Sequence, residues 1–132
     1  MVFIVVKMQE EGIHCYPDAP SEVSYLSCTH RHMFHVELEI EVFDDDRELE
    51  FIMVKHKMQK ELNALFNPHS NSIAWLPNKL SYRFMNRTFS CEMVARALQY
   101  LCKEHFPHQP QRKVNVKVFE DGENGVYLVD KD

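Results

Sequence analysis

The clearest pattern in the chain is a strict alternation of apolar and polar positions between residues 32 and 43. The apolar positions are Phe34, Val36, Leu38, Ile40 and Val42, and the polar positions between them are His35, Glu37, Glu39 and Glu41. Successive side chains of a β-strand point to opposite faces. Alternation of this length therefore predicts a long strand with one buried and one solvated face.

Five further elements are predicted from shorter patterns. β-Branched or alternating runs predict three strands, and apolar residues spaced three and four apart predict two helices. In chain order these are strand Val2–Met8, helix Phe51–Phe66 ended by Asn67 and Pro68, a helix from its N-cap Ser90 to about Glu104, strand Val114–Phe119 and strand Val126–Val129. With the long strand, the order is β-β-α-α-β-β, which is typical of an α+β fold. Residues 67–88 are predicted to form an irregular segment longer than a typical connection.

Length and composition are those of an ordinary globular domain. The chain has 132 residues, of which 45% are hydrophobic and 27% are charged, which favours a single domain over residues 1–132. The formal net charge of −5 argues against a nucleic-acid or anionic-membrane partner, because either would need an excess of Lys and Arg. The three glycines exclude a glycine-rich phosphate loop.

The cysteines and the apolar runs bear on the compartment. No CxxC pair occurs among the four cysteines, which are Cys15, Cys28, Cys91 and Cys102. The apolar run Met1–Met8 is too short for a secretory leader and carries Lys7. No apolar run approaches the ~20 residues needed to cross a bilayer. These features predict a cytoplasmic protein with reduced thiols, with disulfides as the alternative.

Three of the eight histidines could meet at one end of the first two strands. His30 and His32 stand two residues apart at the start of the long strand, so their imidazoles share one face. If the first two strands form an antiparallel hairpin, the chain brings His14 alongside this pair. Three neutral imidazoles suit Zn²⁺, and three protein ligands with an open fourth position are typical of catalytic zinc. The alternative is a set of surface histidines at a strand edge.

In their order and spacing, these motifs resemble the 6-pyruvoyltetrahydropterin synthase and 6-carboxytetrahydropterin synthase family. In that family a histidine closes the first strand and a histidine–any–histidine pair opens the second, as His14 and His30-Arg31-His32 do here. The family's second helix starts with Thr/Ser-Ser-Glu, which Ser90-Cys91-Glu92 matches, and a pterin-anchoring glutamate ends a Val-rich strand, as Glu120 does. The resemblance spans nearly the whole chain.

The resemblance implies the tunnelling fold, in which a four-stranded antiparallel sheet carries two helices on one face. It implies Zn²⁺ as the cofactor, with His14, His30 and His32 as its ligands. It also implies that Glu120, Ser90 and Glu92 bind a pterin-like small-molecule substrate. Finally, it implies a homo-oligomer, a trimer or hexamer with sites between subunits.

The chain departs from the family at two catalytic positions. The family's catalytic cysteine stands four residues before the histidine pair, where this chain has Leu26, and the nearest thiol on that loop is Cys28. The family's Asp-His pair after the first helix corresponds to Asn67-Pro68-His69, which lacks the aspartate. Cys28 is therefore the candidate catalytic base and His69 its candidate proton-transfer partner, with Cys15 as the reserve thiol.

Two functions are compatible with these residues. The first is a zinc-dependent lyase of the 6-carboxytetrahydropterin synthase type, acting on 7,8-dihydroneopterin triphosphate in deazaguanine (queuosine-type) precursor synthesis. The second is a catalytically degenerate protein of the same fold that binds zinc and a pterin or purine. The histidine triad and Glu120 favour the lyase, whereas the missing aspartate and the displaced cysteine favour the binding protein.

Overall fold

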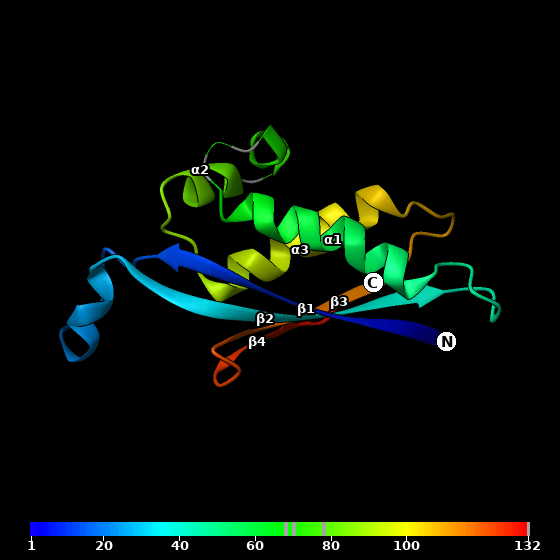
Figure 1. The fold of residues 1–132 in the computed structure, drawn as a ribbon, viewed down its shortest axis with the longest axis horizontal. Coiled ribbons are helices and arrows are strands. Elements are labelled where there is room, and N and C mark those ends of the chain that lie inside the picture. The colour runs from blue at the N-terminus through cyan, green and yellow to red at the C-terminus, as the bar shows by residue number, and fades with distance from the viewer. Residues whose placement is uncertain (68, 70, 78, 132) are drawn as a thin grey trace.

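The computed structural model describes residues 1–67, 69, 71–77 and 79–131, and its centre is a four-stranded antiparallel sheet (Figure 1). The strands lie side by side in chain order, as β1 (Val2–His14), β2 (His30–Val42), β3 (Val114–Glu120) and β4 (Gly125–Leu128). The predicted α+β class and the β-β-α-α-β-β order are confirmed. Pro68, one of the two residues predicted to end the first helix, lies outside the described residues.

The first strand is longer than its apolar pattern predicts. The pattern stops at Met8, but β1 continues to His14 because every one of its residues pairs with β2. Polar side chains at residues 9–11 interrupt the pattern, yet the backbone hydrogen bonds to β2 continue past them. His14 is therefore the last residue of the strand rather than a loop residue, and it lies directly opposite His30.

Two helices of 15 residues each, α1 (Phe51–Leu65) and α3 (Cys91–His105), cover one face of the sheet (Figure 1). Both are capped by the residue before them: the side chains of Glu50 and Ser90 accept hydrogen bonds from backbone N–H groups of the first turn. The predicted bounds of both helices are correct to within a residue or so. Between the helices and the sheet lies one hydrophobic core.

The segment predicted to be irregular, residues 67–88, contains two short helices in its described part. They are η2 (Asn71–Trp75) and α2 (Leu80–Met85). Ile73 and Phe84 are each only 1% exposed, so burial against the rest of the fold orders a stretch that has no helical periodicity of its own. A third short helix, η1 (Ser21–Ser27), lies in the loop between β1 and β2, which extends beyond the end of the sheet (Figure 1).

Strand register brings the even-numbered residues of β1, β2 and β3 to the face that the helices cover. In β2 the buried residues of this face include Phe34, and the same row continues outward through His32 to His30. In the neighbouring strands, Gly12 pairs with His32 and Glu120 pairs with Phe34. The apolar core row therefore ends in a polar group at one end of the sheet.

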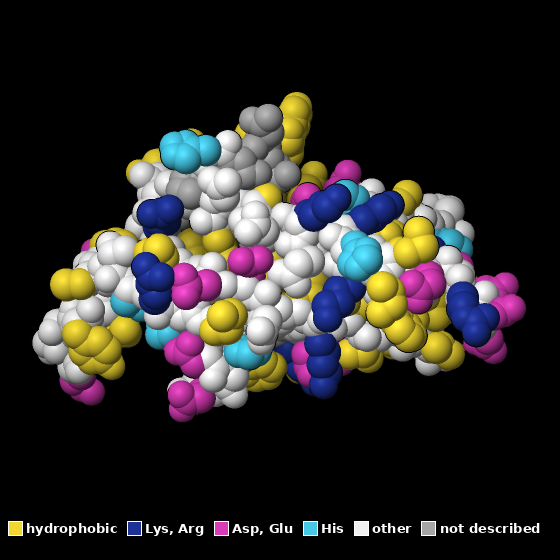
Figure 2. Space-filling view, viewed as in Figure 1, with side chains coloured by type: hydrophobic (Ala, Val, Ile, Leu, Met, Phe, Trp, Pro, Cys, Tyr) yellow, Lys and Arg dark blue, Asp and Glu magenta, His cyan; other side chains and the backbone are white. Residues whose placement is uncertain are grey.

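Within the described part of the chain, no helix combines the length and the apolar character needed to span a bilayer. On the face seen in Figure 2, Lys and Arg side chains are interspersed with Asp and Glu side chains. That face therefore carries no broad patch of a single charge sign.

Candidate metal centre

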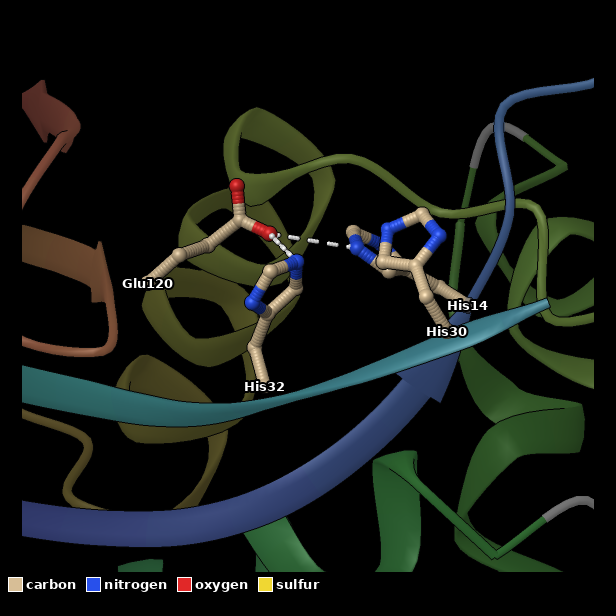
Figure 3. A group of neighbouring side chains, drawn as sticks. All are labelled: His14, His30, His32 and Glu120. Carbon is tan, nitrogen blue, oxygen red and sulfur yellow. Dashed lines mark ion pairs between the residues drawn. The ribbon is translucent and has the colours of Figure 1, made fainter. Parts of the chain in front are cut away.

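Four side chains that can bind a metal ion meet where β1 ends and β2 begins. They are His14, His30, His32 and Glu120, and we call them the four-ligand group. Each offers one ligand atom, and these atoms all lie within 4.8 Å of one another. Figure 3 shows the Glu120 carboxylate pointing toward the histidine rings. Three strands contribute to the group, so only the folded sheet assembles it.

Backbone carbonyl groups orient two of the three imidazoles. Nδ1 of His14 lies 2.9 Å from the carbonyl oxygen of Phe89, and Nδ1 of His30 lies 2.8 Å from that of Cys28. Because a carbonyl oxygen can only accept a hydrogen bond, each ring carries a proton on Nδ1, and its Nε2 is left to bind a cation. Metal-binding histidines are held in the same way, through the ring nitrogen that does not touch the metal.

A carboxylate orients the third imidazole. Oδ2 of Asp121 lies 2.7 Å from Nδ1 of His32, and Oδ1 accepts a hydrogen bond from the N–H of Met33 at 2.9 Å. The hydrogen bond from Met33 is the largest cause that lowers the pKa of Asp121, and the hydrogen bond with His32 lowers it further. The carboxyl group of Asp121 is therefore ionised at neutral pH. Sequence analysis missed Asp121. The available signal was a second carboxylate directly after Glu120, at the start of a turn.

Glu120 completes the group with an oxygen ligand. Its Oε2 lies 3.1 Å from Nε2 of His14 and 3.1 Å from Nε2 of His32. Among the described residues, the buried Nε2 of His14 has no hydrogen-bond partner. Unprotonated imidazole nitrogens and a carboxylate repel one another unless a proton or a metal ion lies between them. The four side chains therefore fit a bound metal ion, which would accept electron pairs from all of them.

The surroundings of Glu120 keep its carboxylate in the ionised form. When a proton rather than a metal ion lies between them, the interaction with the His14 ring is the largest cause that lowers the pKa of Glu120, and it acts against burial, which raises this pKa. The positive charge of His32, His14 and His30, when they are protonated, lowers the pKa of Glu120 further. An ionised carboxylate is the form that binds a metal ion.

A cluster of aromatic rings packs against the four-ligand group on the side of the hydrophobic core. Phe34 is fully buried, and its ring centroid lies 5.4 Å from that of His14 and 6.1 Å from that of His32. The same ring lies 4.9 Å from Phe66 and 5.9 Å from Phe89. Because close-packed rings of this kind have little room to move, the cluster fixes the positions of the histidine rings above it.

A cavity of about 530 Å³ adjoins the four-ligand group. His14, His30 and Glu120 form part of its wall, and so do Ser90 and Glu92 at the start of α3. The three residues predicted to bind substrate, Glu120, Ser90 and Glu92, therefore line one cavity together with two of the predicted metal ligands. Its volume lies within the range of small-molecule sites.

The thiols differ in how they are placed. Cys28 is exposed at the end of η1, and its thiol is not part of the cavity wall, although its carbonyl group contacts His30. Cys15, the reserve candidate, is partly buried and lines the cavity. Cys91 also lines it, but burial, with Glu120 and Glu92 nearby, raises the pKa of the Cys91 thiol to about 12. Cys15 is therefore the partly accessible thiol of the cavity.

His69, the predicted proton-transfer residue, is exposed in the segment after α1. Its backbone N–H donates a hydrogen bond to the side-chain oxygen of Asn67 at 3.2 Å. Among the described residues it belongs neither to the four-ligand group nor to the cavity wall. The chain by itself therefore does not bring His69 to the histidine triad.

No protein-family model matches the sequence, and no curated protein is significantly similar to it.

Proposed function

We propose that this protein is a cytoplasmic, zinc-dependent lyase of the 6-carboxytetrahydropterin synthase type. Its substrate would be 7,8-dihydroneopterin triphosphate, and its product a precursor of deazaguanines of the queuosine type. The observation that carries the proposal is that the four-ligand group lies at the edge of a cavity, and that Glu120 belongs to both. A metal ion and a ligand-binding carboxylate would then act on the same small molecule.

Zinc is proposed because of the chemistry of the four donors. Three imidazole nitrogens with one carboxylate oxygen form a four-coordinate donor set that Zn²⁺ accepts, whereas Ca²⁺ and Mg²⁺ prefer oxygen ligands. When bound, Zn²⁺ supplies Lewis-acid polarisation of a substrate oxygen. Three histidines suffice to hold it, so Glu120 could bind the metal in the resting protein and substrate during turnover.

A pterin is proposed as the ligand because its edge complements the cavity wall. The 2-amino group and the neighbouring ring N–H of a pterin are adjacent donors, and one ionised carboxylate accepts from both. Glu120 is such a carboxylate, since its pKa is lowered. Ser90 adds a hydroxyl group and Glu92 a second carboxylate to the same wall. The cavity therefore favours a ligand rich in hydrogen-bond donors.

Proton transfer is assigned to a thiol and a histidine. Cys28 was predicted as the base and His69 as its partner, while Cys15 is the partly accessible thiol that lines the cavity. In this proposal the base thiolate accepts a proton on Sγ from a substrate carbon next to the polarised oxygen. We keep Cys28 and Cys15 as the two candidates, because their substitution separates them by experiment.

Association of several copies would change the surroundings of the exposed residues Cys28 and His69. β1 and β4 are the edges of the sheet, and edge strands present unpaired backbone groups to a neighbour. We propose that these edges join the sheets of neighbouring copies into trimers or hexamers, with sites between subunits.

A second function is favoured by one specific observation. Neither Cys28 nor His69 lines the cavity in the described part of the chain. A protein that keeps the metal and the ligand but has lost the proton-transfer groups would be a binding protein for zinc and a pterin or purine. This is the alternative to the lyase.

The test is to incubate the zinc-loaded protein with 7,8-dihydroneopterin triphosphate and to follow the products by mass spectrometry. The lyase predicts a 6-carboxytetrahydropterin product that requires His30, so His30→Ala should abolish it. Loss of turnover in Cys28→Ala but not in Cys15→Ala would assign the base to Cys28, and the reverse would assign it to Cys15. Substrate that binds but stays intact would reject the lyase in favour of the binding protein.

A further inference from the structure

The turn between β3 and β4 is tied to β2 by three hydrogen bonds, all through Asp121. The N–H of Asp121 donates to the carbonyl oxygen of Met33 at 2.7 Å. Its Oδ1 accepts from the N–H of Met33 at 2.9 Å, and its Oδ2 lies 2.7 Å from Nδ1 of His32. Both carboxylate oxygens are therefore engaged by β2, and one of them contacts a member of the four-ligand group.

The backbone of Asp121 adopts a conformation that most residues avoid. Its φ is +56°, and the next residue, Gly122, has φ of +73°. Only glycine takes up the left-handed region without strain, although Asp and Asn tolerate it better than other residues do. Glycine would thus suit the backbone of position 121 at least as well, so the backbone alone does not explain the aspartate. The hydrogen bonds of its side chain with Met33 and His32 do.

The acceptor at His32 differs in kind from those at the other two histidines. His14 and His30 face backbone carbonyl groups, whereas His32 faces a side chain. An ionised carboxylate forms a stronger hydrogen bond than a neutral carbonyl group and makes the opposite ring nitrogen more basic. A side chain can also be replaced without altering the path of the backbone. His32 is therefore the ligand whose orientation a substitution can test.

We propose that Asp121 is a positioning residue of the metal centre, whose carboxylate holds His32 with its proton on Nδ1 and its Nε2 directed at the metal. The inference rests on the proposed metal binding and extends it to a residue that does not touch the metal. It gives the β3–β4 turn a role in metal affinity, because Glu120 and Asp121 are consecutive. One turn thus supplies a ligand and orients another.

Asp121→Asn tests the proposal with little change of shape. An amide has one acceptor atom, and two donors, the N–H of Met33 and Nδ1–H of His32, face this position. If the amide oxygen accepts from Met33, the NH₂ group faces Nδ1 of His32 and favours the tautomer protonated on Nε2, which cannot bind the metal through that nitrogen. Asp121→Gly removes the carboxylate altogether while suiting the positive φ. Glu123→Gln is the matched control, since it removes one negative charge from the same turn.

Two measurements decide the outcome. In metal-free protein, the ¹⁵N NMR shifts of the His32 ring should indicate the Nδ1-protonated tautomer in wild type and in Glu123→Gln, but not in Asp121→Asn. In competition with a chromophoric chelator, zinc affinity should fall about 10- to 100-fold in Asp121→Asn and Asp121→Gly, and should stay unchanged in Glu123→Gln. Amide NMR spectra will show whether each variant is folded.

An unchanged His32 tautomer in both folded Asp121→Asn and folded Asp121→Gly, or a zinc affinity within twofold of wild type in both variants, would overturn the proposal. If the wild-type protein binds no zinc, the proposed function fails instead. The tautomer measurement on metal-free protein then still decides whether Asp121 orients His32. The two failures are therefore distinguishable.

Discussion

Gly12 of β1 lies directly across from His32 of β2, at the place where the hydrophobic core gives way to the metal centre. A Cβ atom built at Gly12 would stand 2.9 Å from Cε2 of Phe34 and 3.1 Å from Cδ2 of Phe66. Phe34 is fully buried and is in contact with the rings of His14 and His32. The absence of a side chain at Gly12 is therefore what lets the aromatic cluster lie close beneath the histidines.

We expect Gly12→Ala to destabilise the protein and to weaken metal binding. Overpacking of a filled core costs about 1–3 kcal/mol, which outweighs the gain of roughly 0.5–1 kcal/mol from replacing glycine within a strand. Urea unfolding and zinc titration measure the two effects. Glu11→Ala is the control, because its side chain is exposed and pairs with Arg31 at the surface, so its loss should change stability by less than about 1 kcal/mol. A Gly12→Ala variant as stable as wild type would contradict this account of the packing.

His30→Ala and His32→Ala should each lower bound zinc well below one ion per chain. Removal of either imidazole leaves only two histidines with Glu120, and such a remnant holds zinc poorly. His35→Ala is the matched control, since His35 belongs to the same strand but points to the opposite face of the sheet. Elemental analysis after dialysis provides the readout. Full occupancy in both His30→Ala and His32→Ala would exclude this metal site.

Alkylation of the folded protein should divide the four cysteines into two classes. Burial raises the pKa values of Cys91 and Cys102 to about 12, so at pH 8 both are almost entirely neutral thiols, which react slowly. Cys28 is exposed and should react first, followed by the partly buried Cys15. Mass spectrometry of peptides after iodoacetamide treatment measures the order. In urea all four should react, and equal rates in the folded protein would contradict the prediction.

Glu120→Gln should reduce the acid sensitivity of the metal-free protein. Contact with His14 and the charges of the neighbouring histidines hold the pKa of Glu120 below its ordinary value of 4.5, despite the opposing effect of burial. The unfolded chain therefore takes up this proton first as the pH falls. The stability that ionised Glu120 contributes is present above pH 4.5 and is lost as the pH falls through the lowered pKa.

The measurement for Glu120 is urea unfolding of metal-free wild type and Glu120→Gln, from pH 7 down to pH 3. The difference in unfolding free energy between the two proteins should shrink below about pH 4.5, because the glutamine variant has no carboxyl group to protonate at this site. A difference that stays constant over this range would show that the Glu120 carboxyl group titrates normally.

Light scattering tests the proposed assembly. In the described part of the chain no strand pairs with the outer edge of β1 or of β4, so trimers or hexamers are expected at micromolar concentration. A dilution series shows whether the measured mass depends on concentration. A monomer throughout the micromolar range would count against sites between subunits. It would also mean that no neighbouring copy places Cys28 or His69 beside the cavity.

The sequence by itself determined those features that depend on local spacing. Alternation after His32 was enough to predict β2, since side chains two residues apart on a strand share a face. The same rule predicted that the imidazoles of His30 and His32 lie on one face. The pattern of apolar residues predicted α1 and α3, and Ser90 marked the start of α3. Local patterns failed where packing outweighed them, as in the polar second half of β1 and in the short helices η2 and α2.

Only the tertiary structure decided how the metal centre is assembled. Register pairs His14 with His30, and Glu120 with Phe34, which joins a carboxylate to histidines that are 88 to 106 residues away in the chain. Two of the acceptors that orient the rings, the carbonyl group of Phe89 and the side chain of Asp121, are likewise distant in the chain from the histidines they meet. Backbone groups are the same at every residue, so no sequence motif records that His14 will meet Phe89. Their positions follow from the packing of the sheet against the helices, and the centre exists only once that packing has formed.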